Sequence, residues 1–122
     1  MNEDGFERTK TRTRERLQAA VRELIPKNGI DALTVKTIAR QAGVSPVSIY
    51  NHFGGVNELI LDVARRLVQG IWEQYQAVIC GHGTFMQKLD ALLQLRIGYI
   101  RDGSWRILQG VGERYGGIWK NA

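Results

Sequence analysis

The sequence predicts an all-α fold, and three observations carry that prediction. Apolar residues recur at helical spacing over long stretches, most clearly over 56–79 and 85–101. Glycine-containing breaks at 28–29 and 54–55 interrupt the pattern. Between these breaks, two short helical segments meet at a turn that contains Gly43. We expect a three-helix unit with a helix-turn-helix, followed by a long connecting helix and an incomplete helical domain.

Length and charge limit the domains and the partner. With 122 residues, 43% of them hydrophobic, the chain can support one modest core. We expect the helix-turn-helix unit in 1–55 and the helical remainder in 56–122. The net charge of +5 suits a polyanion, although acidic residues are spread throughout. The cations gather near the start, where Arg8, Lys10, Arg12, Arg14 and Arg16 fall within nine residues.

The cysteine count and hydropathy indicate a cytoplasmic protein. Cys80 is the single cysteine, which excludes an internal disulfide and suits a reducing compartment. The start has no signal-peptide pattern, and no run of about 18 apolar residues could form a membrane span.

The first helix is expected over about 13–27, with an apolar stripe that includes Leu17 and Val21. Residues 1–11 are polar and include Gly5, which predicts a mobile arm. Its basic end could follow a phosphate backbone or enter a minor groove, and a solvated tail is the alternative. Pro26 should kink the helix or stop it about a turn early.

The second helix begins after Thr34, a favourable cap, and carries its apolar residues on one face. Gly43 should end it at positive φ, and Val44 can return to the core. Ser45 then caps a third helix in which Pro46 takes the first position.

In the third helix, Ile49 and Phe53 are the plainly apolar pair and should face inward. The polar residues that must face elsewhere, toward a DNA groove, are Ser48, Asn51 and His52. An ordinary helical hairpin is the alternative interpretation.

The spaced residues across about 12–65 resemble the DNA-binding domain of TetR/AcrR-family transcriptional repressors. The matching positions are Arg16, Ala20, Gly29, Thr34, Ile38-Ala39, Ala42-Gly43-Val44-Ser45, Ile49-Tyr50-Asn51-His52-Phe53 and Glu58-Leu59. The resemblance implies that the first helix supports the motif from behind. It also implies that 56–122 is a ligand-binding and dimerising region, apparently truncated. The family usually has a lysine where Val56 stands, so one phosphate contact is expected to be missing.

By position, the resemblance implies that DNA is bound by Lys36, Ser45, Pro46, Val47, Ser48, Tyr50, Asn51 and His52. Lys36 and the terminal arginines would hold phosphates, whereas Tyr50 and His52 would contact the backbone. Asn51 could pair with adenine and Val47 could touch a thymine methyl, with Ser48 permissive.

In the remainder, Thr84 and Gln87 fit a capping box that opens a helix over about 85–101. Residues 102–122 are less regular: Ser104 could cap a short helix, which the glycines from Gly110 onward should weaken. Six aromatic residues could line an apolar ligand pocket or could be ordinary core residues. They are Trp72, Tyr75, Tyr99, Trp105, Tyr115 and Trp119.

Catalysis is not expected, because no nucleophile lies beside a base and no paired carboxylates lie in an apolar setting. Cys80 and His82 lack the second pair that a zinc site needs, so we predict neither a metal nor another cofactor.

The predicted function is a sequence-specific repressor that binds a palindromic operator in double-stranded DNA. A small apolar or cationic effector would release it, and the active form would be a homodimer if dimerising helices are present or replaced. The alternative is a short form that pairs with a full-length relative and modulates it. Because the chain is short for the family, it is a natural short form, a truncation product or a fragment, and the sequence leaves these open.

Overall fold

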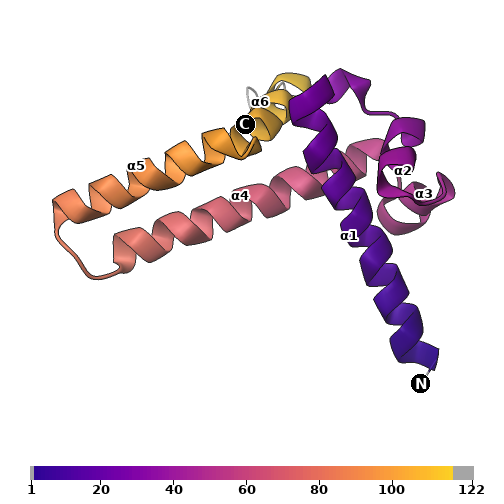
Figure 1. Cartoon of the computed structure of the whole chain (residues 1–122), viewed down its shortest axis with the longest axis horizontal. Helices are drawn as coiled ribbons and strands as arrows, with labels where there is room; N and C mark the ends of the chain where they lie inside the picture. The colour runs from indigo at the N-terminus through magenta and orange to yellow at the C-terminus, as the bar shows by residue number, and fades with distance from the viewer. Residues whose placement is uncertain (1, 117–122) are drawn as a thin grey trace.

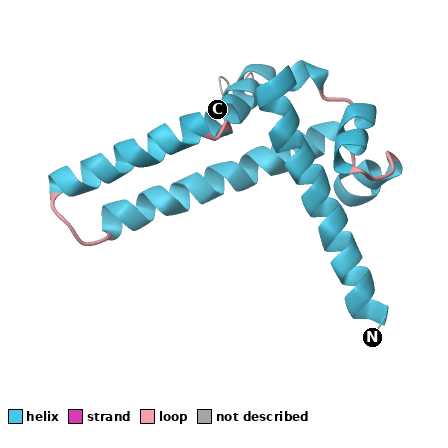
Figure 2. Ribbon diagram, in the orientation of Figure 1, coloured by secondary structure: helices cyan, strands magenta, loops and turns pink. Residues whose placement is uncertain are grey.

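The computed structural model describes residues 2–116, and this part of the chain is helical, without strands (Figure 2). The elements are α1 (Asn2–Asn28), η1 (Ile30–Ala32), α2 (Val35–Ala42), α3 (Val47–Phe53), α4 (Val56–Cys80), α5 (Phe85–Arg101) and α6 (Ser104–Tyr115). The predicted all-α class is confirmed.

The helices form a head and a long hairpin (Figure 1). In the head, α2 and α3 lie beside the start of α4, and α1 crosses them with its N-terminal part projecting outward. The hairpin consists of α4 and α5, which run antiparallel away from the head. Helix α5 brings the chain back to the head, where α6 packs against α1 and α4.

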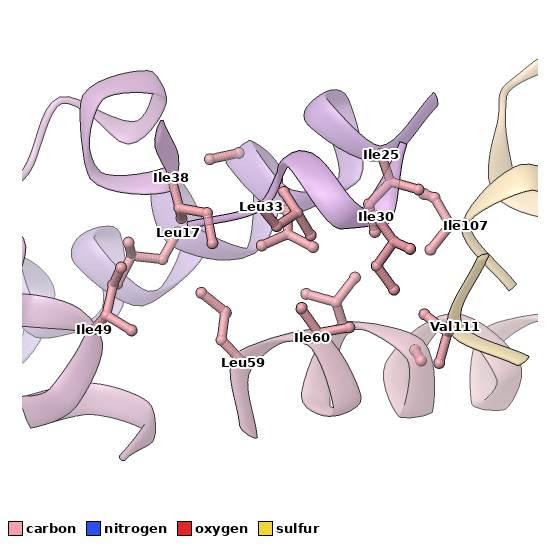
Figure 3. Packing of buried hydrophobic residues seen from close by; sticks show 14 residues of the cluster. Leu17, Ile25, Ile30, Leu33, Ile38, Ile49, Leu59, Ile60, Ile107 and Val111 are labelled. Atoms are coloured by element: carbon pink, nitrogen blue, oxygen red, sulfur yellow. The ribbon is translucent and has the colours of Figure 1, made fainter. Parts of the chain in front are cut away.

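A single apolar cluster holds the head together (Figure 3). Leu17 of α1, Ile49 of α3 and Leu59 of α4 have 0% exposure, so three helices meet at completely buried side chains. Ile107 and Val111 of α6 close the other end of the cluster. Burial of this apolar surface is the main force that fixes α2 and α3 against their supports.

The predicted start of the first helix, at Thr13, is wrong. Helix α1 begins at Asn2, so the residues expected to form an arm are helical and continuous with it. The Thr9 hydroxyl donates to the Gly5 carbonyl at 2.9 Å and the Thr11 hydroxyl to Glu7 at 2.9 Å, both one turn back. Glu, Arg and Lys are good helix formers, and one glycine does not outweigh them.

The helix also does not stop early at Pro26, as the sequence had suggested; it continues to Asn28. The proline ring packs against α6: a Cβ added to Gly103 would lie 3.1 Å from Pro26 Cγ. Arg106 Nη1 donates to the Pro26 carbonyl at 3.4 Å. Tertiary contacts therefore compensate for the proline.

Helix α6 departs from the prediction as well. It runs without a break through Gly110, because Ile107 and Val111 are drawn into the core and Gly110 itself lies close to Ile30. Burial thus overrides weak helix propensity. Ser104 is the first helical residue rather than the cap, and its N–H donates to Asp102 Oδ1 at 2.9 Å.

The two helices of the hairpin form close to the predicted bounds, and Thr84 and Gln87 make the expected capping box. Helix α5 contributes no buried residue. The aromatic residues do not gather around one pocket: Tyr75 and Tyr99 contact each other, Trp72 is exposed, and Trp119 lies outside the described residues. None of the helices in residues 2–116 is long and apolar enough to cross a bilayer.

Candidate nucleic-acid interface

Helix α2 is fixed at both ends by local chemistry. The Thr34 hydroxyl accepts from the Thr37 N–H at 3.1 Å, and Thr37 Oγ1 accepts from the Thr34 N–H at 2.9 Å. At the other end Gly43 has φ 69° and ψ 34°, the left-handed region that glycine reaches without strain. The Val44 N–H donates to the Ala39 carbonyl at 3.1 Å, which closes the helix end. Both predicted boundaries are confirmed.

Helix α3 begins one residue later than predicted, at Val47, and Pro46 is its cap residue. Ser45 does not cap it with its side chain. Instead the Ser45 carbonyl accepts from the Ser48 N–H at 3.1 Å, and the two hydroxyl oxygens lie 3.1 Å apart. The turn is therefore tightened by the serine pair, and the proline precedes the first helical residue.

The two faces of α3 differ sharply. Ile49 has 0% exposure and Phe53, one turn later, packs partly buried against the same cluster. Val47 is 58% exposed and Tyr50 56% exposed, and Asn51 is also exposed. Positions three and four apart share one helix face, so these three side chains form one outward surface.

The remaining predicted site residues surround this surface. Ser48 and His52, four apart, lie half-buried along one edge of α3. Ser45 and Pro46 are exposed in the turn, and Lys36 is exposed in the first turn of α2. The structure thus brings seven of the eight predicted residues together on the turn and α3, with Lys36 on the neighbouring helix.

Sequence reasoning missed the specific contacts of Arg14. Its Nη1 donates to the His52 carbonyl at 2.5 Å, and its guanidinium carbon lies 4.4 Å from the centre of the Phe53 ring. The two bonded residues are 38 positions apart, and no local pattern reports such a pairing. The only signal was the position of Arg14 one turn before Leu17, a core residue.

Arg14 also affects the charge of His52. Partial burial lowers the pKa of His52 below its ordinary value, and the positive charges of Arg14 and Lys10 lower it further. The imidazole is therefore favoured in its neutral form in the free protein.

A groove of about 610 Å³ separates the projecting part of α1 from the end of α3. Its lining includes Lys10 and Arg14 on one side and Asn51 and His52 on the other. Hydroxyl groups of α1 and one acidic residue, Glu7, complete it. A groove with this balance of charge suits a polyanionic backbone next to α3.

Two features fix the start of α4 beneath this surface. Val56, where the resemblance would place a lysine, packs partly buried against the core. Asp62 accepts from Gln18 Nε2 at 2.9 Å, and from Arg65 and Arg66 at 2.9 and 3.1 Å. Although partial burial opposes this, these bonds lower the pKa of Asp62 below its ordinary value. Helix α1 is therefore tied to α4 as well as to α3.

Comparison with known proteins identifies the three-helix unit. The sequence model described as "Bacterial regulatory proteins, tetR family" matches residues 17–63. Residues 17–63 form a tetR-family domain. The matched part begins within α1 and ends within α4, so it contains the whole helix-turn-helix.

Relatives of this chain are named as regulators. It is 34% identical to the "HTH-type transcriptional regulator BetI" of Brucella anthropi over 82 residues, 67% of this chain and 42% of that protein. It is 31% identical to the "Uncharacterized HTH-type transcriptional regulator YvdT" of Bacillus subtilis over 77 residues, 63% of this chain and 39% of that protein. The chain thus spans about two fifths of the length of these relatives. No solved structure matches it significantly.

Proposed function

We propose that this chain is a transcriptional regulator that binds duplex DNA by placing α3 in the major groove. One observation carries the proposal: Val47, Tyr50 and Asn51 share an exposed face on a helix whose opposite face is anchored by Ile49. Exposed apolar residues on such a short helix contribute nothing to the core, but they can contact base edges. The family match and the names of the relatives support this function.

The residues take different roles in this proposal. Asn51 pairs with adenine and Val47 contacts a thymine methyl group. Ser45, Pro46 and Ser48 form the turn edge that approaches the groove, and the two serine hydroxyls share one hydrogen bond. The remaining contacts are to phosphates and position the protein: Lys36, Tyr50, His52 and the basic residues of α1 that precede Arg14.

Two substitutions test these roles on a duplex selected from a randomised pool and on its scrambled counterpart, at fixed moderate salt. Asn51→Ala should cost about 1 to 3 kcal/mol on the selected duplex and relax preference at one base position. Lys36→Ala should weaken binding to both duplexes alike and reduce the salt dependence.

Gln94→Ala is the control, because Gln94 is exposed on α5, far from α3. Equal losses on both duplexes for Asn51→Ala would contradict base reading by α3. The absence of any selected sequence for the unmodified chain would contradict the proposed function itself.

The regulatory part of the proposal is repression of a palindromic operator in the cytoplasm by a homodimer, with release by a small effector. An apolar groove of about 540 Å³ between α4 and α6 supports the effector. Its lining includes Leu61, Val68, Leu108 and Val111, with Arg65 as its charged residue. Its described lining residues include no acidic side chain, which favours an apolar effector over a cationic one.

A second candidate is that the chain pairs with a longer relative and modulates it. The observation that favours it is the outer face of α5, where large apolar residues remain exposed at helical spacing: Met86, Leu89, Leu93, Ile97 and Ile100. Sedimentation of the purified chain separates the two candidates. A homodimer that enriches a palindrome supports the first, and a monomer that binds DNA only weakly until a longer relative is added supports the second.

A further inference from the structure

Helix α3 is short and has one fully buried anchor. Ile49 is its only buried residue, and it lies near the middle of Val47–Phe53. Ile49 and the partly buried Phe53 fix where α3 sits, but its C-terminal end can still tilt unless a further contact holds it. To read bases, α3 must have the right orientation as well as the right position, because its outward side chains must reach particular base edges.

The second anchor lies at the C-terminal end of α3 and comes from α1. The last carbonyls of a helix have no partner within it, and they carry partial negative charge. Gly54 closes one of them by donating to the Tyr50 carbonyl at 3.0 Å. Arg14 Nη1 donates to a second of these carbonyls, that of His52, at 2.5 Å. The guanidinium carbon of Arg14 lies 4.4 Å from the centre of the Phe53 ring.

We propose that Arg14 is a positioning residue that sets the direction of α3 and thereby its base preference. This inference rests on the proposed DNA-binding function. Arg14 is half-buried, so its guanidinium is committed to the carbonyl and the ring rather than free in solvent. It precedes the residues 17–63 that the family model matches. One turn later Gln18 donates to Asp62 of α4, a contact of α1 that does not involve α3.

A positioning role differs from a direct phosphate contact in what each variant loses. Arg14→Met keeps much of the side-chain volume but removes the charge and the donor. Arg14→Lys keeps the charge but not the planar group that stacks on Phe53. A phosphate contact depends on charge and acts on all sequences, whereas an anchor acts only where the direction of α3 matters.

The experiment measures binding of the full chain and its variants to the selected and the scrambled duplex over a range of salt. Arg14→Met should lower affinity for the selected duplex by about tenfold, leave the scrambled duplex nearly unchanged and keep the salt slope. Arg14→Lys should lose most of the same discrimination. Gln18→Ala is the matched control, because it removes a polar contact of α1 that does not touch α3.

Equal losses on both duplexes, with a shallower salt slope and rescue by Arg14→Lys, would overturn the proposal in favour of a phosphate contact. An unchanged ratio between the two duplexes would also overturn it. If the unmodified chain shows no sequence preference, the proposed function fails, and amide spectra of the free protein decide about Arg14. Arg14→Met should then shift the signals of α3 and reduce their protection from hydrogen exchange, and unchanged α3 signals would refute the anchor.

A pH titration of the histidine ring signals tests the contact directly. Removal of the positive charge of Arg14 should raise the pKa of His52. His82, in the turn at the far end of the hairpin, provides the control signal.

Discussion

The head and the α4–α5 hairpin are built from the same kind of element, yet they treat apolar residues in opposite ways. Leu17, Ile38 and Ile49 of the head are completely buried, whereas Leu93 is 52% exposed and Phe85 78% exposed on α5. In the head, the apolar faces of the helices are buried against one another. The outer face of α5 is apolar without being covered, which is typical of a helix that packs on two sides.

Polar contacts follow the same division. In the head they join helices that are distant in sequence, as in the Arg14 and His52 pair and the Gln18 and Asp62 pair. In the hairpin the cap formed by Thr84 and Gln87 is local. Two hydrogen bonds join the two helices: Tyr99 donates to Gln74, and Lys88 Nζ donates to the Ile79 carbonyl at 2.7 Å beside the turn. The head should unfold as one cooperative unit, and the hairpin should be less firmly held because α5 has no buried residue.

The largest expected effect tests this contrast with one chemical change in two places. Leu17→Ala should destabilise the protein by about 2 to 5 kcal/mol, because it leaves a cavity in the core. Leu93→Ala should change stability by less than about 0.5 kcal/mol. Equilibrium unfolding in urea measures both. A large loss for Leu93→Ala would mean that the outer face of α5 is covered in solution.

Replacing one glycine in each region should change stability by a smaller amount, with a loss in the head and a gain in the hairpin. Gly43→Ala should cost about 1 to 2 kcal/mol, because φ is 69° there and a Cβ is strained even in open space. Gly98→Ala should stabilise by about 0.5 to 1 kcal/mol, since Gly98 lies within α5 with nothing within 4 Å of an added Cβ. Thermal unfolding compares the two variants. A gain in stability for Gly43→Ala as well as for Gly98→Ala would show that the turn after α2 does not need glycine.

The smallest effect concerns pH. The pKa of His52 is lower in the folded state than its unfolded value of 6.5. The neutral imidazole therefore contributes its full stability above pH 6.5, and this stability is lost as the pH falls through the folded pKa. The unmodified protein should therefore lose more stability between about pH 7.5 and pH 5.5 than His52→Gln does. Urea unfolding at both pH values measures the difference. Equal losses would show that His52 is not held neutral.

Much of the fold could be predicted because its signals are local. The cap at Thr34, the glycine turn at Gly43 and the capping box at Thr84 each lie within a few residues of the helix end that they define. The predictions failed where distant contacts decide the outcome. Pro26 is accommodated by packing against α6, and α6 itself continues through Gly110 because its apolar residues reach the core.

The candidate site divides in the same way. The outward face of α3 was predictable, because Ile49 and Phe53 had to face inward and so left Val47, Tyr50 and Asn51 outside. Their roles on DNA remain proposals. The contacts of Arg14 were not predictable, because nothing near Arg14 in the sequence indicates a partner at the end of α3.

By itself, the sequence determined the helical class, the ends of α2, α4 and α5 and the residues that face outward from the helix-turn-helix, because spacing and caps act over a few positions. Only the tertiary structure decided that a basic groove lies between α1 and α3 and that Arg14 binds the end of α3. It also decided that α6 completes the core. These features depend on which surfaces meet after the chain has folded, and segments far apart in the sequence bring those surfaces together.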